Sequence, residues 1–196
     1  MPSVTEVSRK NDPYLVLIFC VLSLRTKDKT TIEASRRLFG IADGPQKMSE
    51  MPLGKLQNLI YPVGFYRNKA KFIKEISRRI ISEFEGSVPA SLEDLLTLRG
   101  VGRKCANLVL GLGFGKPAIC VDTHVHRITN RLGWVKTKTP EQTEGALKRI
   151  IPRKYWIDLN TILVTFGQNI CVPVSPYCNR CLARKSCRRV GVNSSR

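Results

Sequence analysis

Four cysteines fall close together near the C-terminus, at Cys171, Cys178, Cys181 and Cys187, with the spacing C-x6-C-x2-C-x5-C. Disulfides are the weaker interpretation because no secretory signal precedes them. A structural zinc site usually uses two C-x2-C-like pairs or a mixture of Cys and His, whereas this chain has one such pair and both of its histidines lie far away in sequence. The spacing therefore favours a [4Fe–4S] cluster, with zinc as the alternative. Either group would fix a segment that is too short to fold alone.

The rest of the chain shows helical periodicity, and no alternating strand pattern stands out. Asp12, Ser91, Asp122 and Thr139 are suited to cap the first turns of helices. The clearest amphipathic segment, 67–85, has Lys69 and Lys71 on a charged face that we expect to be solvated. The sequence predicts an all-α protein with helices over 13–24, 26–39, 52–60, 67–85, 91–98, 104–112, 123–132, 140–151 and 155–166.

The charge balance indicates a polyanionic partner. The 196 residues contain 33 Lys and Arg against 15 Asp and Glu, a formal net charge of +18. Such an excess on a small globule favours binding to nucleic acid. No apolar stretch is long enough to span a membrane, and the first ten residues lack an apolar signal region, so we expect an intracellular protein without membrane contact. Nothing in the sequence indicates oligomerisation, and a monomer is expected.

A glycine-rich turn between two predicted helices is the best candidate for a nucleic-acid contact. The segment Leu98–Ala106 reads LRGVGRKCA, in which Gly100 and Gly102 flank Val101. The glycines allow a tight turn and close approach by a partner, while Val101 would fix the turn to the core. The turn leads into a helix N-terminus whose free N–H groups can hold a phosphate.

At this point a family resemblance becomes apparent. The segment LRGVGRKCA, followed by VDTH at 121–124, resembles the helix–hairpin–helix and catalytic loop of endonuclease III DNA glycosylases. The cysteine spacing is similar to that family's iron–sulfur loop. The segments DPYLVLIFCVLSLRTKD and GFYRNKA resemble its early helices and a strand-separating turn. The resemblance runs from about residue 12 to residue 187.

The resemblance implies an all-α fold of two helical domains with a DNA-binding cleft between them. One domain would span 7–116 and include the helix–hairpin–helix at 98–106. The other would join residues 1–6 to 117–196 and carry the cluster loop at 171–187. The implied partner is double-stranded DNA that contains damaged bases or abasic sites.

The implied activity is base-excision repair by a bifunctional DNA N-glycosylase and AP lyase acting on oxidised pyrimidines. Lys104 matches the family's nucleophile, which attacks the sugar C1′, forms a Schiff base and permits β-elimination of the 3′-phosphate. Asp122 matches the catalytic carboxylate, which could take a proton from Lys104 and stabilise positive charge on the sugar. The expected iron–sulfur ligands are the four clustered cysteines.

The remaining expected DNA contacts include two departures from the family pattern. Arg25 stands where the family typically has Gln, at the position expected to fill the gap left by a flipped base. Phe65 stands where an aliphatic wedge is usual, and its ring would stack on the orphaned base. The other expected contacts are Gly100, Val101, Gly102, Arg103 and His124.

Two other functions remain open at this stage. One is a monofunctional mismatch glycosylase acting on uracil, thymine or adenine, although such relatives generally lack a lysine at the Lys104 position. The other is a non-catalytic helix–hairpin–helix DNA-binding protein, which the net charge suits equally well.

Overall fold

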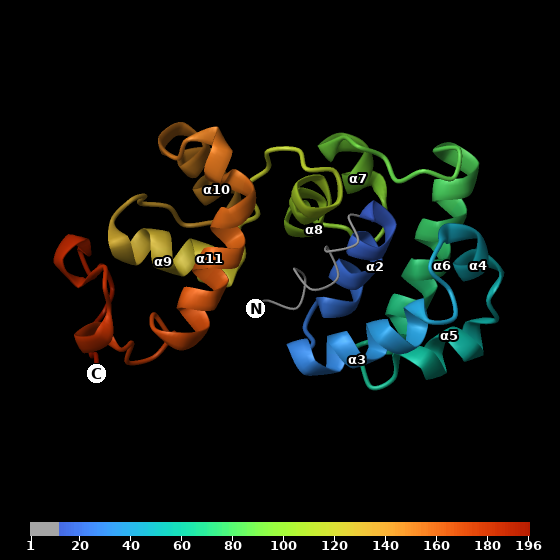
Figure 1. Ribbon diagram of the computed structural model, residues 1–196, viewed down its shortest axis with the longest axis horizontal. Coiled ribbons are helices and arrows are strands. Elements are labelled where there is room, and N and C mark those ends of the chain that lie inside the picture. Colours follow the sequence, from blue (N-terminus) through green and yellow to red (C-terminus); the bar gives the residue numbers. More distant parts are fainter. Residues whose placement is uncertain (1–11) are drawn as a thin grey trace. The chain divides into compact units, whose positions relative to one another are not determined.

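The computed structural model describes residues 12–196, and this part of the chain is helical and contains no strand (Figure 1). It divides into two compact units, and the boundary along the chain falls between Lys116 and Pro117. The expected contribution of residues 1–6 to the second domain lies outside the described residues, so that domain assignment stays a prediction. None of the described helices is long and apolar enough to cross a membrane.

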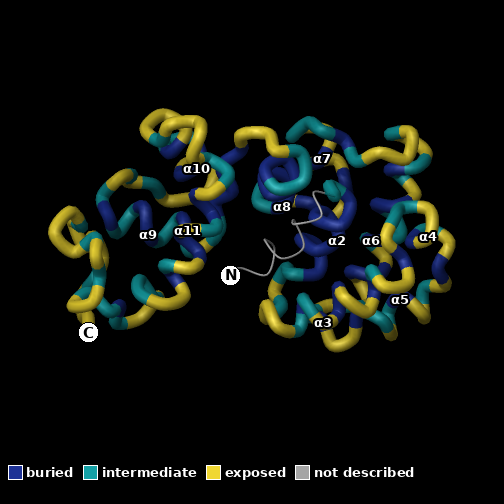
Figure 2. Tube along the Cα trace, in the orientation of Figure 1, coloured by how far each residue is buried: buried dark blue, intermediate teal, exposed yellow. Residues whose placement is uncertain are grey.

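The first unit is built around a helix that is buried on every side. This helix, α2, is almost entirely apolar, and its residues 14–22 are all buried (Figure 2). It packs against α3, α6, α8 and η1. The elements of this unit are α2 (Pro13–Ser23), α3 (Asp28–Phe39), α4 (Pro45–Glu50), α5 (Leu53–Ile60), α6 (Tyr66–Glu83), α7 (Leu92–Thr97), α8 (Arg103–Leu108) and the π-helix η1 (Val109–Gly113).

The second unit has its own apolar core, formed by the extended segment 119–121 and three helices. Ile119, Val121, Val125, Ile128 and Leu163 are among its buried members. The elements of this unit are α9 (Thr123–Leu132), α10 (Pro140–Ile150), η2 (Arg153–Tyr155), α11 (Trp156–Asn169), η3 (Cys178–Arg180) and η4 (Arg184–Ser186).

The helix starts follow local capping chemistry. Asp12 accepts hydrogen bonds from the N–H groups of Tyr14 and Leu15 at 2.8 and 3.1 Å, and Ser91 accepts one from the N–H of Asp94 at 3.0 Å. Thr139 does the same for Gln142 at 3.3 Å. These caps satisfy N–H groups that have no partner within the helix, and for this reason the helix starts could be predicted from the sequence.

Three features depart from the sequence analysis. The short helix α4 was not predicted, and the helix expected over 104–112 is α-helical only to Leu108, after which it widens into η1. The third departure is Lys69, which was expected on the solvated face of α6 but is buried, with 5% of its surface exposed. Its neighbour Lys71 is exposed as expected.

Candidate functional site

The helix–hairpin–helix turn of the first unit packs against the interior on one side and faces open space on the other. Gly100 has a φ of +83°, and a Cβ at this position would lie 2.9 Å from the ring of Phe72. Val101 is buried and its N–H donates to the carbonyl of Leu98 at 3.0 Å. A Cβ on Gly102, by contrast, would meet no described atom within 4 Å. The turn therefore needs Gly100 for its own packing, while Gly102 faces space that a ligand can enter.

Lys104 lies in the first turn of α8, directly after this hairpin. Gly102 is the N-cap, and its carbonyl accepts the N–H of Ala106 at 3.0 Å. Lys104 and Arg103 are both half-buried, whereas Cys105 is buried. The fold thus places Lys104 in the first turn of a helix, where the helix dipole disfavours an added positive charge.

Asp122 begins α9 in the second unit as its N-cap. Its Oδ1 accepts hydrogen bonds from the N–H groups of His124 and Val125, both at 2.9 Å. Both bonds use the same oxygen, so capping holds the carboxylate in place without occupying Oδ2. Lys104 and Asp122 belong to different units, and their joint action on one substrate stays a prediction.

His124 is held against α11. Its Nδ1 lies 3.1 Å from Arg127 Nη2, and a Cβ on Gly167 would come within 2.4 Å of that same nitrogen. Gly167 is therefore required for the close packing of α9 on α11. This packing accounts for His124 structurally, and its expected DNA contact stays a prediction.

Arg25 and Phe65 lie at the tips of two adjacent loops in the first unit. Both are exposed and both adopt left-handed backbone conformations, with φ values of 51° and 58°. The guanidinium carbon of Arg25 lies 5.8 Å from the centre of the Phe65 ring, in a cation–π arrangement. Arg25 and Phe65 belong to separate sequence motifs, and the structure brings their side chains together.

Two residues that the sequence analysis did not select join these loops. The N–H of Gly64 donates to Thr26 Oγ1 at 3.2 Å, and a Cβ on Gly64 would lie only 2.6 Å from the carbonyl oxygen of Arg25. The two backbones therefore approach more closely than any residue other than glycine permits. Because the bonded residues are 38 positions apart in sequence, no local pattern could have revealed this link.

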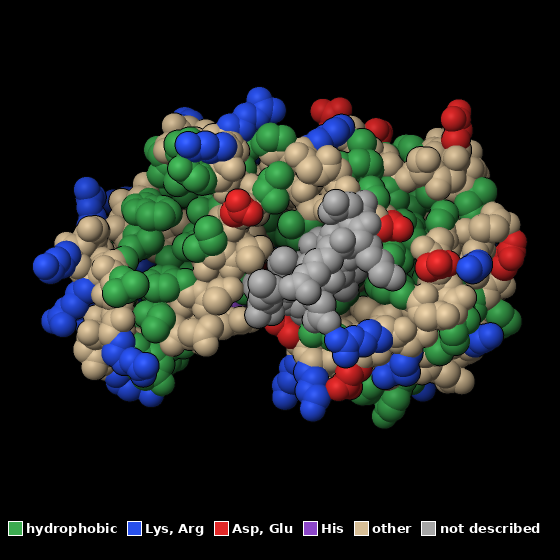
Figure 3. Space-filling view, in the orientation of Figure 1, with side chains coloured by type: hydrophobic (Ala, Val, Ile, Leu, Met, Phe, Trp, Pro, Cys, Tyr) green, Lys and Arg blue, Asp and Glu red, His purple; other side chains and the backbone are tan. Residues whose placement is uncertain are grey.

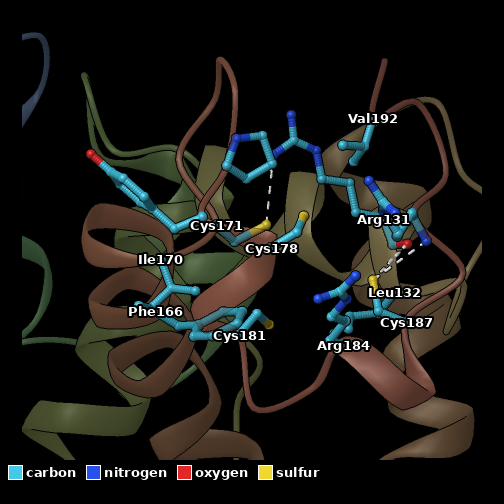
Figure 4. Close-up of a pocket in the computed structure, with 13 residues that line it drawn as sticks. Arg131, Leu132, Phe166, Ile170, Cys171, Cys178, Cys181, Arg184, Cys187 and Val192 are labelled. Carbon is cyan, nitrogen blue, oxygen red and sulfur yellow. Dashed lines mark hydrogen bonds between the residues drawn. The ribbon is translucent and has the colours of Figure 1, made fainter. Parts of the chain in front are cut away.

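The four clustered cysteines of the second unit line one cavity (Figure 4). The cavity wall also contains the apolar side chains of Leu132, Phe166, Ile170 and Val192. No His, Asp or Glu among the described residues lies on the cavity wall. No group of three or more His, Cys, Asp or Glu within residues 12–196 is arranged to hold a metal ion. All four cysteines nevertheless lie on the wall of this one cavity, and the thiol of Cys181 is close enough to the other three that burial and their proximity together raise its pKa.

Arginines connect this cavity to α9. Arg131 donates from Nη1 to Cys171 Sγ at 3.6 Å and to the carbonyl of Val172 at 2.8 Å. Arg127 Nη2 donates to the carbonyl of Cys171 at 2.8 Å, and burial lowers the pKa of its guanidinium. Arg184 and Arg189 lie on the cavity wall itself. Arg127 and Arg131 therefore hydrogen-bond α9, the helix capped by Asp122, to the cysteine loop.

Comparison with known proteins identifies the class. Residues 18–153 match the HhH-GPD superfamily of base excision DNA repair proteins, and the chain belongs to that superfamily. Endonuclease III of Thermotoga maritima is 51% identical over 179 residues, which cover 91% of this chain and 84% of that protein. Within the superfamily this protein is a member of the endonuclease III family of DNA glycosylases and AP lyases.

Solved structures and eukaryotic relatives agree with this assignment. A trapped endonuclease III–DNA covalent intermediate matches with a TM-score of 0.85 and 36% identity, covering 91% of this chain and 84% of that one. A thermostable thymine-DNA glycosylase matches with a TM-score of 0.83 and 25% identity, covering 95% and 93%. The endonuclease III-like protein 1 of Mus musculus is 45% identical over 93% of this chain, which spans 62% of its length.

Proposed function

We propose that this enzyme removes oxidised pyrimidines from double-stranded DNA and then cleaves the abasic strand, with Lys104 as the nucleophile. The observation that carries the proposal is the position of Lys104 in the first turn of α8, directly after a hairpin whose Gly102 faces open space. A phosphate bound at that hairpin would bring the neighbouring deoxyribose to Lys104. A DNA substrate also implies that the protein works in the compartment that holds the DNA.

The proposed reaction requires that the damaged nucleotide leave the base stack, because stacking blocks C1′. The neutral amine of Lys104 attacks C1′, the glycosidic bond breaks, and the base departs as an anion that takes a proton from water. The amine nitrogen loses a proton, O4′ gains one as the sugar ring opens, and a Schiff base then joins Lys104 to C1′. Loss of a C2′ proton then expels the 3′-phosphate by β-elimination. Asp122 accepts the amine proton and stabilises positive charge on the sugar, with its Oδ2 the available oxygen.

Arg25 and Phe65 would occupy the space that the flipped base leaves in the duplex. A guanidinium can fill the gap and donate hydrogen bonds, and an aromatic ring can stack on the orphaned base. Their proximity supports a shared role, since one loop pair would enter the helix at one point. Gly100, Val101, Gly102 and Arg103 would hold the phosphate backbone, and His124 is a further candidate contact.

The four cysteines are proposed to hold a [4Fe–4S] cluster. A single zinc ion with Zn–S bonds of about 2.3 Å would draw its sulfurs to within about 4 Å of each other. Four thiols on one cavity wall, with apolar neighbours, nearby arginines and no His among the described wall residues, suit an anionic iron–sulfur cluster. When bound, the cluster would supply a cross-link that fixes the loop and, through Arg127 and Arg131, the helix that begins at Asp122.

Borohydride trapping tests the proposed chemistry. Reduction of the Schiff base should join the enzyme covalently to a duplex containing an abasic site, and Lys104→Ala should abolish that adduct. Lys116→Ala provides a matched control in the same unit, because Lys116 is exposed and donates to the carbonyl of Ala90. An adduct that persisted in Lys104→Ala would show that another amine is the nucleophile.

A second candidate function is a monofunctional mismatch glycosylase, which the similarity to the thymine-DNA glycosylase favours. Such an enzyme uses water to release the base and has no need of the amine of Lys104. A panel of duplexes, each with one defined lesion and scored separately for base release and strand nicking, distinguishes the two. Release of mismatched thymine without nicking would support this second function.

A further inference from the structure

The buried Lys69 is unusual because a lysine in a protein interior must be compensated by specific partners. It lies one turn into α6, the helix that begins directly after Phe65. Only 5% of its surface is exposed, and burial lowers its pKa from 10.5 to about 8. The ammonium therefore remains mostly protonated at neutral pH, in spite of the cost of desolvation.

The ammonium of Lys69 is anchored on the loop that carries Arg25. Its Nζ donates to the carbonyl of Leu22 at 2.8 Å and to that of Leu24 at 2.5 Å. It also donates to Thr26 Oγ1 at 3.0 Å. The two carbonyls belong to the C-terminal end of α2, where the helix dipole and unpaired acceptors favour a cation. These bonds hold the residues on both sides of Arg25.

Lys69 is also linked to the loop that carries Phe65. Its backbone N–H donates to the carbonyl of Phe65 at 3.0 Å. The hydroxyl of Thr26 that accepts from the ammonium also accepts from the N–H of Gly64. The ammonium therefore contacts the loop of Arg25 directly and the loop of Phe65 through the hydroxyl of Thr26, while the main-chain bond to Phe65 is the usual first-turn bond of α6.

We propose that Lys69 is a positioning residue that sets Arg25 and Phe65 as one rigid unit for insertion into damaged DNA. This inference rests on the proposed function, in which these two side chains replace the flipped base and stack on its orphaned partner. Both tips adopt left-handed backbone conformations, which non-glycine residues hold only when their surroundings enforce them. The buried ammonium and its three acceptors provide that enforcement for the Arg25 loop.

The test compares Lys69→Met with Lys71→Met in the full-length enzyme. Both variants remove one charge from α6, but Lys71 is exposed. In single-turnover assays on a duplex with an oxidised pyrimidine, we expect Lys69→Met to slow base release about tenfold or more, and Lys71→Met to stay within about twofold of the parent. Thr26→Val removes the shared hydroxyl and serves as a second variant if Lys69→Met does not fold.

A double-mutant cycle and a spectroscopic readout separate positioning from general stability. We call Arg25 and Phe65 together the wedge. If Lys69 acts through the wedge, adding Lys69→Met to Arg25→Ala and Phe65→Ala should slow base release no further. In a duplex with 2-aminopurine opposite a stable abasic analogue, the parent should quench the fluorescence by stacking Phe65 on the orphaned base. Lys69→Met and Thr26→Val should lose that quenching while they keep the parent's affinity for undamaged duplex.

Three outcomes would overturn the inference. Additive effects in the cycle, or unchanged quenching in a folded Lys69→Met, would show that Lys69 does not act through the wedge. If Arg25→Ala and Phe65→Ala had no effect of their own, the proposed role of the wedge would fail and the inference would fail with it. Borohydride trapping at Lys104 reports on the proposed chemistry independently of these results.

Discussion

At the scale of single residues, Asp122 combines a structural and a proposed chemical role. As the N-cap of α9 it accepts hydrogen bonds from two backbone N–H groups through Oδ1, and these bonds fix the position of its carboxylate. A rigidly held carboxylate is well suited to catalysis because it needs little reorganisation during the reaction. The two roles can be separated, since capping requires an oxygen whereas proton transfer requires an acid.

Asp122→Asn should separate these two roles. Asparagine caps helices about as well as aspartate, so the free energy of unfolding should change by less than about 0.5 kcal/mol. Base release should slow by a factor of about 10² or more because the amide cannot accept the proton of Lys104. Thermal melting and single-turnover kinetics measure the two effects. Unchanged stability together with an unchanged rate of base release in this variant would indicate a capping role alone.

At the scale of elements, the helix–hairpin–helix turn uses its two glycines for different reasons. Gly100 is required by its left-handed φ and by the Phe72 ring beneath it. Gly102 has a φ of −98°, which other residues adopt readily, and its Cβ position is open. The interior of the protein therefore does not explain Gly102, whereas the approach of a phosphate would.

Paired alanine substitutions test this distinction. Gly100→Ala should destabilise the fold by about 1–3 kcal/mol, since it imposes backbone strain and a clash with Phe72. Gly102→Ala should change stability by less than about 1 kcal/mol but weaken DNA binding about tenfold, because the methyl group occupies the space of the phosphate. Denaturant unfolding and equilibrium DNA binding measure the two quantities. Undiminished DNA binding by Gly102→Ala would contradict the proposed phosphate contact.

At the scale of the whole molecule, each unit is stabilised in a different way. The first surrounds the fully buried α2 and has a large apolar interior. The second has a smaller core, and its last residues form only short 3-10 turns around the cysteine cavity. Lys and Arg side chains gather along this C-terminal segment (Figure 3). A cross-link would offset both the limited burial and the repulsion among these charges.

Removal of one cysteine ligand should affect the second unit selectively. Cys178→Ala should abolish the brown colour of an iron–sulfur protein and speed amide hydrogen exchange in α9 and α11, because the loop is bonded to both helices. Exchange in 12–116 should stay close to that of the parent. Cys120→Ala, which removes a buried thiol from the same unit, should keep the colour. A colourless parent protein that binds zinc would instead support the zinc alternative.

The sequence determined the all-α class, the capped helix starts and the family because these depend on short-range patterns. Asp12, Ser91 and Thr139 act on N–H groups within three residues, so their role can be predicted without a fold. The repair family was also correctly inferred from motifs that are contiguous in sequence.

The tertiary structure decided what distant segments do to one another. Lys69 was expected in solvent because its helix periodicity places it among charged residues, yet its acceptors lie 43 to 47 positions away on the loop of Arg25. The pairing of Arg25 with Phe65 and the arginine links from α9 to the cysteine loop arise in the same way. A single sequence specifies side-chain chemistry and local periodicity, but the burial of a charge depends on which acceptors the completed fold brings to it.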